Sequence, residues 1–226
     1  MKKRFFVTGT DTDAGKTYVT VGLLKAAQRA GLKSMGLKPI AAGADLVNGA
    51  LRNDDALQIQ AASNVALVYE QVNPILLEAA IAPHIAALQE GRLVTASRLD
   101  GFIKGALLTP HDFALVEGAG GWRVPLNDRE MVSDVAKSLG LPVIVVVNMK
   151  LGCLNHAMLT VEAIARDGLS LAGWIANTCA ERMPCYEENL ASLQAMISSP
   201  LLGELPWCSS ERDSYEVFDA LFLALK

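Results

Sequence analysis

The sequence predicts an α/β fold in which a doubly wound, mostly parallel sheet has helices on both of its faces. Short β-branched or aromatic runs alternate with helical stretches from one end of the chain to the other. The run at residues 143–147 is apolar on both faces, which is typical of a strand in the centre of a covered sheet. No repeat, low-complexity tract or linker interrupts the alternation, so residues 1–226 are expected to form a single domain.

The first predicted strand, at residues 4–7, leads through a loop into a helix at residues 16–30. Gly31 is expected to end that helix, because glycine readily adopts the left-handed conformation that follows a helix C-cap. Further strands are predicted at residues 34–38, 113–116, 143–147, 171–176 and 201–205, and further helices at residues 95–108, 155–166, 186–196 and 215–225. Ligands bind beyond the carboxyl ends of the strands in such a sheet, so residues just after strands are the functional candidates.

Composition and charge exclude several classes of protein. Of the 226 residues, 51% are hydrophobic and 19% charged, which favours a large buried core over disorder. The net charge of −4 gives no basic surface for nucleic acid. The longest apolar run, residues 141–147, is far shorter than the roughly 20 residues that span a bilayer. Apolar residues 5–7 run directly into a polar segment, so no signal-peptide core follows the basic start and a cytoplasmic protein is expected.

Cysteine and histidine do not suggest a metal site or a nucleophile. No C-x-x-C pair occurs, which favours reduced thiols over a zinc site or a disulfide framework. No Ser-His-Asp arrangement occurs in a motif context, so the histidines are expected to be structural or exposed. The side chains concerned are those of Cys153, Cys179, Cys185, Cys208, His84, His111 and His156.

The strongest local signal is the segment at residues 9–17, which lies between the first predicted strand and the first predicted helix. It ends in Gly15, Lys16 and Thr17, as a phosphate-cradling loop requires, with backbone N–H groups and the helix dipole directed at an anion. Lys16 would reach the terminal phosphates, and the Thr17 hydroxyl would contact Mg²⁺. Five residues separate Gly9 from Gly15, one more than usual, and a simple capped turn would leave the last three residues unexplained. A P-loop NTPase type of fold is therefore predicted.

Two polar features follow the second predicted strand. Lys38 stands at its end, where a lysine is either a solvated charge or a ligand-facing group at the carboxyl edge of the sheet. The polar cluster at residues 52–55 precedes a helical segment at residues 56–60. Its simplest interpretation is a helix N-cap with acidic residues in the first turn, and its alternative is a binding role for Asp55.

Glu117 ends an apolar strand, at the place where P-loop proteins position the acid that holds Mg²⁺. The glycine-rich residues 118–121 would let the backbone approach a ligand closely. A hairpin turn could use such glycines, but it would not need the preceding acid. Together two lysines, one hydroxyl and two carboxylates predict a phosphoryl-transfer site, in which positioning and charge neutralisation provide catalysis.

Several ordered sequence blocks carry a resemblance to a known family over nearly the whole chain. They lie at residues 6–12, 15–17, 38–39, 51–53, 55–57, 72–74, 83–85, 116–122, 125–126, 150–153, 155–157, 202–204 and 206–207. On these blocks the sequence resembles the dethiobiotin synthetases of biotin biosynthesis, and the long glycine spacing is that family's own form of the loop.

The resemblance implies an ATP-dependent closure of a cyclic urea. The substrates would be 7,8-diaminononanoate, CO₂ (or bicarbonate) and ATP, and the products dethiobiotin, ADP and phosphate. One amine would form a carbamate, the carbamate would take the γ-phosphoryl group from Mg·ATP, and the second amine would close the ring. The enzyme would be a homodimer with Mg²⁺ as cofactor, and without nucleic-acid or membrane partners.

The resemblance also implies roles for individual residues. The catalytic residues would be Lys16 and Lys38, and the metal-associated residues Thr17, Asp55 and Glu117. The ATP-binding residues would be Asp13, Ala14, Gly15, Lys16, Thr17, Tyr18, Asp55, Glu117, Gly118, Ala119, Gly120, Asn177, Thr178, Pro206, Trp207, Cys208 and Asp213. The substrate-binding residues would be Thr12, Lys38, Ala42, Gly152, Cys153, Leu154 and Asn155, the last four at a helix start where a substrate carboxylate would bind.

The chain departs from the family's pattern at three positions. Ala42 stands where a serine commonly meets the substrate, so only backbone groups could act there. Ala14 replaces a valine in the loop. A tyrosine that borders the substrate across the dimer has no clear match, because Asn189 aligns with it and Tyr186 is only nearby.

Two other P-loop functions remain as alternatives. Synthetases that activate corrin-ring carboxylates carry a further glutaminase domain, for which 226 residues are expected to leave no room. Switch ATPases of the partitioning type usually have a second lysine in the loop, where this chain has Asp11. They also often end in a basic amphipathic helix, whereas residues 214–226 are acidic and apolar up to the last residue.

Overall fold

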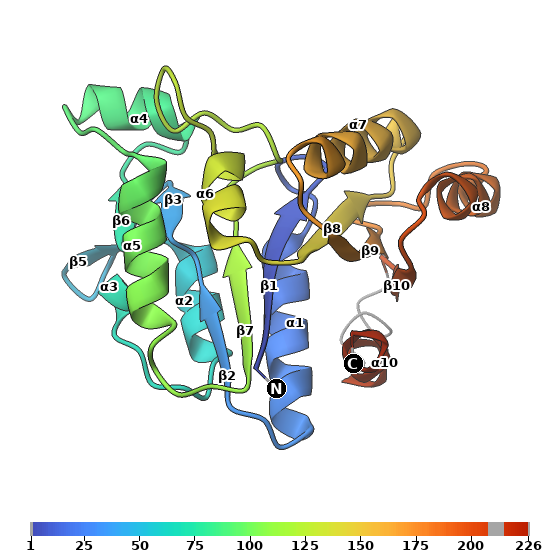
Figure 1. Cartoon of the computed structure of the whole chain (residues 1–226), viewed down its shortest axis with the longest axis horizontal. Helices are drawn as coiled ribbons and strands as arrows, with labels where there is room; N and C mark the ends of the chain where they lie inside the picture. Colours follow the sequence, from blue (N-terminus) through green and yellow to red (C-terminus); the bar gives the residue numbers. More distant parts are fainter. Residues whose placement is uncertain (1, 208–214, 226) are drawn as a thin grey trace.

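A parallel sheet of six strands forms the centre of the computed structural model, which describes residues 2–207 and 215–225 (Figure 1). The strands are β1 Lys3–Gly9, β2 Ser34–Leu37, β7 Phe113–Glu117, β8 Val143–Asn148, β9 Leu171–Asn177 and β10 Leu201–Leu205. Their order across the sheet is β10-β9-β8-β1-β7-β2. Because all neighbouring pairs are parallel, the carboxyl ends of all six strands lie at one edge. The predicted fold class is confirmed.

Helices cover both faces of this sheet and form two apolar cores. One face packs against α1 Lys16–Arg29, α2 Asp54–Ala61 and α10 Tyr215–Ala224. The other face packs against α5 Ala96–Ala106, α6 Val132–Leu139, α7 Cys153–Arg166 and α8 Tyr186–Met196, with α5 and α6 in front in Figure 1. Successive residues of a strand point to opposite faces, so Phe6 enters one core while Phe5 and Val7 enter the other. This explains why the strands are apolar throughout.

Several predicted boundaries move by one or two residues, as helix ends and strand ends commonly do. The strand predicted at residues 34–38 ends at Leu37, so Lys38 lies just beyond it. The helix predicted at residues 155–166 begins at Cys153, and the strand predicted at 171–176 continues to Asn177. The helix predicted at residues 95–108 is shorter, Ala96–Ala106, and the last helix ends at Ala224.

The segment between Lys38 and α5 holds most of what the sequence did not predict. A short parallel pair joins β3 Ile40–Ala42 to β6 Ile75–Leu77, and a hairpin joins β4 Asp45–Val47 to β5 Ala50–Arg52. The short helices α3 Tyr69–Val72 and α4 Pro83–Gln89 also belong to this segment, which lies beside β2, at one side of the molecule in Figure 1. Helix α6 was likewise not predicted. Within residues 2–207 and 215–225 no helix is both long enough and apolar enough to cross a membrane.

Candidate functional site

The loop between β1 and α1 has a backbone conformation suited to an anion. Asp13 and Gly15 both have left-handed backbone angles, with φ of 57° and 81°, and turns of this kind bring successive N–H groups together. A Cβ atom at Gly15 would lie 2.1 Å from Nδ2 of Asn177, so only glycine fits at this position. Asn177 also donates a hydrogen bond from Nδ2 to the Ala14 carbonyl at 2.7 Å. Asn177, at the end of β9, thus stabilises the backbone of the loop between β1 and α1.

Lys16 is the first residue of α1, and its side chain is largely buried. Its Nζ donates a hydrogen bond to the backbone carbonyl of Asp11 at 3.2 Å. Burial, and secondly the nearby charge of Lys38, lower the pKa of Lys16. An anionic ligand at the loop would oppose this shift, because it would add a counter-charge beside the ammonium group.

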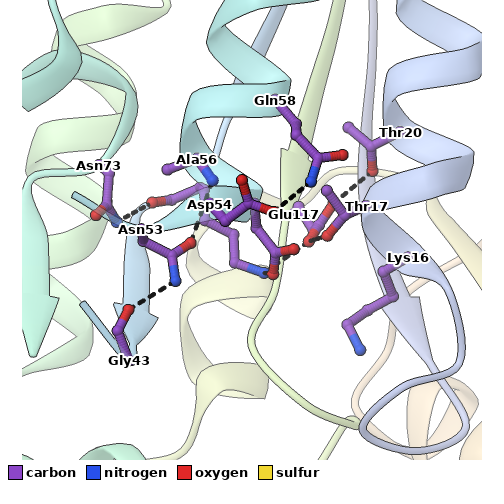
Figure 2. Close-up of polar contacts among 12 residues, drawn as sticks. Lys16, Thr17, Thr20, Gly43, Asn53, Asp54, Ala56, Gln58, Asn73 and Glu117 are labelled. Atoms are coloured by element: carbon purple, nitrogen blue, oxygen red, sulfur yellow. Dashed lines mark hydrogen bonds and ion pairs between the residues drawn. The ribbon is translucent and has the colours of Figure 1, made fainter. Parts of the chain in front are cut away.

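Glu117, the last residue of β7, has a fully buried carboxylate that three side chains hold. Oε1 accepts hydrogen bonds from Thr17 Oγ1 at 2.8 Å and from Lys38 Nζ at 2.6 Å. Oε2 accepts a hydrogen bond from Thr20 Oγ1 at 2.7 Å (Figure 2). A buried carboxylate is costly unless it is paired and hydrogen-bonded, and these contacts provide both. The cluster joins β7, α1 and the end of β2.

Lys38 lies between two carboxylates. Besides its contact with Glu117, its Nζ donates a hydrogen bond to Asp55 Oδ2 at 3.1 Å. The Lys38 side chain is 6% exposed, that of Glu117 0% and that of Asp55 44%. Burial opposes the charge on Lys38, but the two carboxylates outweigh it and raise the pKa of Lys38 above its ordinary value. The solvated-charge interpretation of Lys38 is therefore wrong.

The start of α2 serves as a helix cap and also directs Asp55 toward Lys38. The Asn53 side chain caps the helix by accepting a hydrogen bond from the Ala56 N–H. The Asn53 N–H donates to the Tyr69 hydroxyl at 2.8 Å, and that hydroxyl donates to Asn73 Oδ1 at 3.0 Å. Asn73 Nδ2 in turn donates to the Lys38 carbonyl at 2.6 Å (Figure 2). This chain of hydrogen bonds connects the backbone of Lys38 to the helix that carries Asp55.

A cavity of about 750 Å³ lies at this edge of the sheet. One wall is polar and includes Lys16, Thr17, Lys38 and Asp55, and apolar side chains from the segment after Lys38 and from residues 124–125 form other walls. The predicted site residues that line the cavity are Thr12, Asp13, Gly15, Lys16, Thr17, Lys38, Ala42, Asp55, Ala119 and Gly120. Ala14 and Glu117 are buried beside it, and Gly118 follows Glu117.

Other predicted nucleotide-binding residues lie outside this cavity. Thr178, Pro206 and Trp207 line a separate hollow of about 310 Å³, together with Arg182, Tyr186 and Glu204. Tyr18 lines a third hollow, between α1 and α10. Cys208 and Asp213 lie outside the described residues.

The loop at residues 152–155, predicted to bind the substrate carboxylate, is also separate from the cavity within a single chain. Gly152 caps α7 with φ of 94°, Cys153 is buried, and Asn155 is exposed. None of the four residues Gly152, Cys153, Leu154 and Asn155 is among the cavity-lining residues of the part of the chain that the structure describes. The same loop touches the phosphate loop through an ion pair of 2.8 Å between Lys150 Nζ and Asp11 Oδ2.

Three features of the site were not predicted from the sequence. Thr20 holds the second oxygen of Glu117, Tyr69 and Asn73 support Lys38, and Arg123 lines the cavity while forming an ion pair with Asp167. The spacing of Thr17 and Thr20 on one helical face was the one available signal for Thr20.

The sheet topology, the loop between β1 and α1 and the acid at the end of β7 define the chain as a P-loop NTPase in fold class. Solved structures agree. MinD with Mg-ADP from Pyrococcus horikoshii has a TM-score of 0.60 at 18% identity, with 98% of this chain and 95% of that chain covered. A ParA family ATPase from Chlorobium tepidum has a TM-score of 0.56 at 14% identity, with 98% and 91% covered. At such identities the likeness shows the fold alone.

Sequence comparisons give the family. A family model described as an AAA domain matches residues 3–212. The ATP-dependent dethiobiotin synthetase BioD of Cellvibrio japonicus is 60% identical over 205 residues, which cover 91% of this chain and 90% of that protein. The protein of the same name from Marinobacter nauticus is 53% identical, with 91% and 88% covered. The chain belongs to the dethiobiotin synthetase family, and the resemblance predicted from the sequence is confirmed.

Proposed function

We propose that the chain catalyses the ATP-dependent carboxylation and ring closure of 7,8-diaminononanoate with CO₂ to dethiobiotin, ADP and phosphate. The observation that carries the proposal is the pair of lysines, Lys16 at the phosphate loop and Lys38 after β2, that line one cavity of about 750 Å³. Membership of the dethiobiotin synthetase family supports it independently. The proposal includes a single domain over residues 1–226 and a cytoplasmic location, where ATP is available.

The chemistry brings two anionic groups together. A carbamate forms from one substrate amine and CO₂, and its oxygen attacks the γ-phosphorus of ATP, with ADP leaving. The second amine then attacks the carbonyl of the carbamic-phosphoric anhydride, and phosphate leaves as the ring closes. Two unit charges about 4 Å apart repel by roughly 4 kcal/mol at an effective dielectric near 20. Positive side chains that offset this repulsion are therefore the main requirement of the site.

Lys16 and Lys38 meet this requirement from different sides. Lys16 extends into the phosphate loop and would contact the β- and γ-phosphates of ATP. Lys38 is held between Glu117 and Asp55 and would face the carbamate and the transferred phosphoryl group. Because the carboxylates raise its pKa, Lys38 keeps its charge at neutral pH.

The donor set around Thr17 fits Mg²⁺, a cation that prefers oxygen ligands. The Thr17 hydroxyl donates a hydrogen bond to Glu117, so its oxygen lone pairs remain available to a cation. Asp55 adds a partly exposed carboxylate at the cavity wall, and Glu117 would act directly or through Thr17. When bound with ATP, Mg²⁺ would neutralise charge on the phosphate oxygens.

We also propose that two remote regions complete the site. The nucleotide base would bind beyond the loop that Asn177 contacts. The residues that would bind it are Asn177, Thr178, Pro206, Trp207, Cys208 and Asp213. The loop at residues 152–155 would bind the substrate carboxylate. Since this loop does not line the cavity of its own chain, the proposal is that a second chain of a homodimer contributes it.

The test is an assay of the purified chain with ATP, Mg²⁺, 7,8-diaminononanoate and bicarbonate, with dethiobiotin measured by mass spectrometry. Dethiobiotin and ADP should form in equal amounts, and both should require the diamine. The contrary outcome is ATP hydrolysis at a rate that does not depend on the diamine, with no dethiobiotin formed. It would support the alternative of a switch ATPase of the partitioning type, whose fold the chain shares.

A further inference from the structure

Thr20 contacts Glu117, which also holds Thr17 and Lys38, without itself lining the cavity. It stands one helical turn after Thr17 on α1, so both hydroxyls lie on the same face of the helix. Thr17 donates to Oε1 of Glu117 at 2.8 Å, and Thr20 donates to Oε2 at 2.7 Å. Thr17 lines the cavity and Thr20 is fully buried. The two hydroxyls therefore hold the two oxygens of one carboxylate from the same helix.

The Thr20 contact restrains the orientation of the Glu117 carboxylate together with the two contacts on Oε1. A carboxylate on a flexible side chain can rotate, and a partial rotation would move Oε1 out of hydrogen-bond distance of Lys38 and Thr17. Oε1 already accepts two hydrogen bonds, at 2.6 Å from Lys38 and at 2.8 Å from Thr17. A donor on Oε2 opposes that rotation, and it supplies the hydrogen bond that a buried charged oxygen requires.

We propose that Thr20 is a positioning residue of the phosphoryl-transfer site, acting through Glu117. Its hydroxyl fixes the carboxylate so that Oε1 holds Lys38 and Thr17 in place for ATP and the carbamate. The proposal rests on the proposed function for its turnover measurement but concerns a residue outside the ligand-lining set.

The experiment compares Thr20→Val, which keeps the shape and removes the donor, with Thr20→Ser, which keeps the donor. A hydrogen bond to a charged group contributes enough for a roughly ten- to hundredfold loss of kcat in Thr20→Val. The Mg²⁺ concentration needed for half-maximal ATP binding, measured by equilibrium titration with a fluorescent ATP analogue, should rise in the same variant. ATP analogue binding without Mg²⁺ should stay unchanged, and Thr20→Ser should restore kcat to within about threefold.

Two controls separate positioning from packing. Thr160→Val removes another buried threonine hydroxyl, one that donates to the His156 carbonyl on α7, and it should leave kcat and the Mg²⁺ titration unchanged. In a Glu117→Gln background, Thr20→Val should add little further loss, because contacting residues that act together are not additive.

The outcomes are all decisive for Thr20. Wild-type kcat and Mg²⁺ dependence in Thr20→Val would overturn the proposal, as would equal impairment of Thr20→Val and Thr20→Ser. A Thr20→Val chain that does not fold, beside a folded and active Thr20→Ser chain, would make the hydroxyl a requirement of the fold instead. If the wild-type chain makes no dethiobiotin, the proposed function fails, while the Mg²⁺ titrations still test Thr20.

Discussion

At the scale of single residues, the site contains two buried lysines whose pKa values shift in opposite directions. Burial lowers the pKa of Lys16, whereas the carboxylates of Glu117 and Asp55 raise the pKa of Lys38 despite burial. The sequence predicted Lys16 from the Gly15-Lys16-Thr17 pattern of the phosphate loop, and Lys38 from its place at the end of a strand and from the family resemblance. The sequence could not predict the opposite directions of their pKa shifts, because these depend on side chains that come together only in the folded chain.

Lys38→Leu should lower kcat by at least about a hundredfold while changing ATP affinity little, because on the proposed function Lys38 would face the point where the carbamate and the γ-phosphate meet. Steady-state turnover and ATP titration measure the two effects. The substitution also leaves the Glu117 carboxylate buried without its cation, which should cost about 3–5 kcal/mol of unfolding free energy. Adding Glu117→Gln should recover stability but not turnover. A Lys38→Leu chain that keeps its kcat and loses only ATP binding would make Lys38 a nucleotide anchor.

Lys16 should make ATP binding sensitive to alkaline pH. Its pKa in the free protein is below the ordinary value of 10.5, and the phosphates favour the protonated form. As pH rises through the lowered pKa, the free protein loses this charge. ATP affinity should therefore decrease with rising pH, and the decrease should start before the pH reaches 10.5. Isothermal titration across pH would detect the fall. Lys16→Arg should abolish it, since arginine stays charged, and a flat profile for the wild-type chain would contradict the prediction.

At the scale of elements, the long strands and helices could be predicted and the short ones could not. The central strands are apolar on both faces, and α1, α7 and α8 are helical runs of 14, 14 and 11 residues that lie between such strands. Strands of three residues, such as β3 and β6, have no period to detect. The sequence does contain one hairpin signal in this segment: Asn48 and Gly49 form the turn between β4 and β5, both with positive φ, and this dipeptide is typical of a tight hairpin.

The unpredicted segment supports the site through Tyr69. Its hydroxyl accepts a hydrogen bond from the Asn53 N–H and donates one to Asn73. Tyr69→Phe should therefore lower the unfolding free energy by about 1–3 kcal/mol, because buried polar groups lose their partner. Urea unfolding measures the change. Tyr215→Phe is the matched control, since Tyr215 is exposed and keeps its ring contact with Arg29; it should change stability by less than about 0.5 kcal/mol. Equal unfolding free energies of Tyr69→Phe and Tyr215→Phe would show that the Tyr69 hydroxyl does not stabilise this segment.

At the scale of the whole molecule, the strand order determines which residues meet. Helix α1 follows β1 in the chain and leads to β2. Strand β7 lies between β1 and β2 in the sheet. This brings Lys16, Lys38 and Glu117 to one edge although they are far apart in the sequence. The order β10-β9-β8-β1-β7-β2 could not be read from the alternation of elements, which fits many orders. The same geometry leaves residues 152–155 away from the cavity of their own chain.

A mixing experiment tests whether a second chain supplies that loop. Lys16→Gln should inactivate the phosphate site of its own chain, and Asn155→Asp should place a negative charge where the substrate carboxylate would bind. If the site is shared, a mixed dimer has one site with both defects and one with neither. After unfolding and refolding together, an equal mixture of two inactive variants should regain about a quarter of wild-type activity, because about half of random dimers are mixed. Sedimentation would establish the dimer, and the separately refolded variants should stay inactive. If each chain used its own loop, every dimer would lack an intact site and mixing would restore nothing.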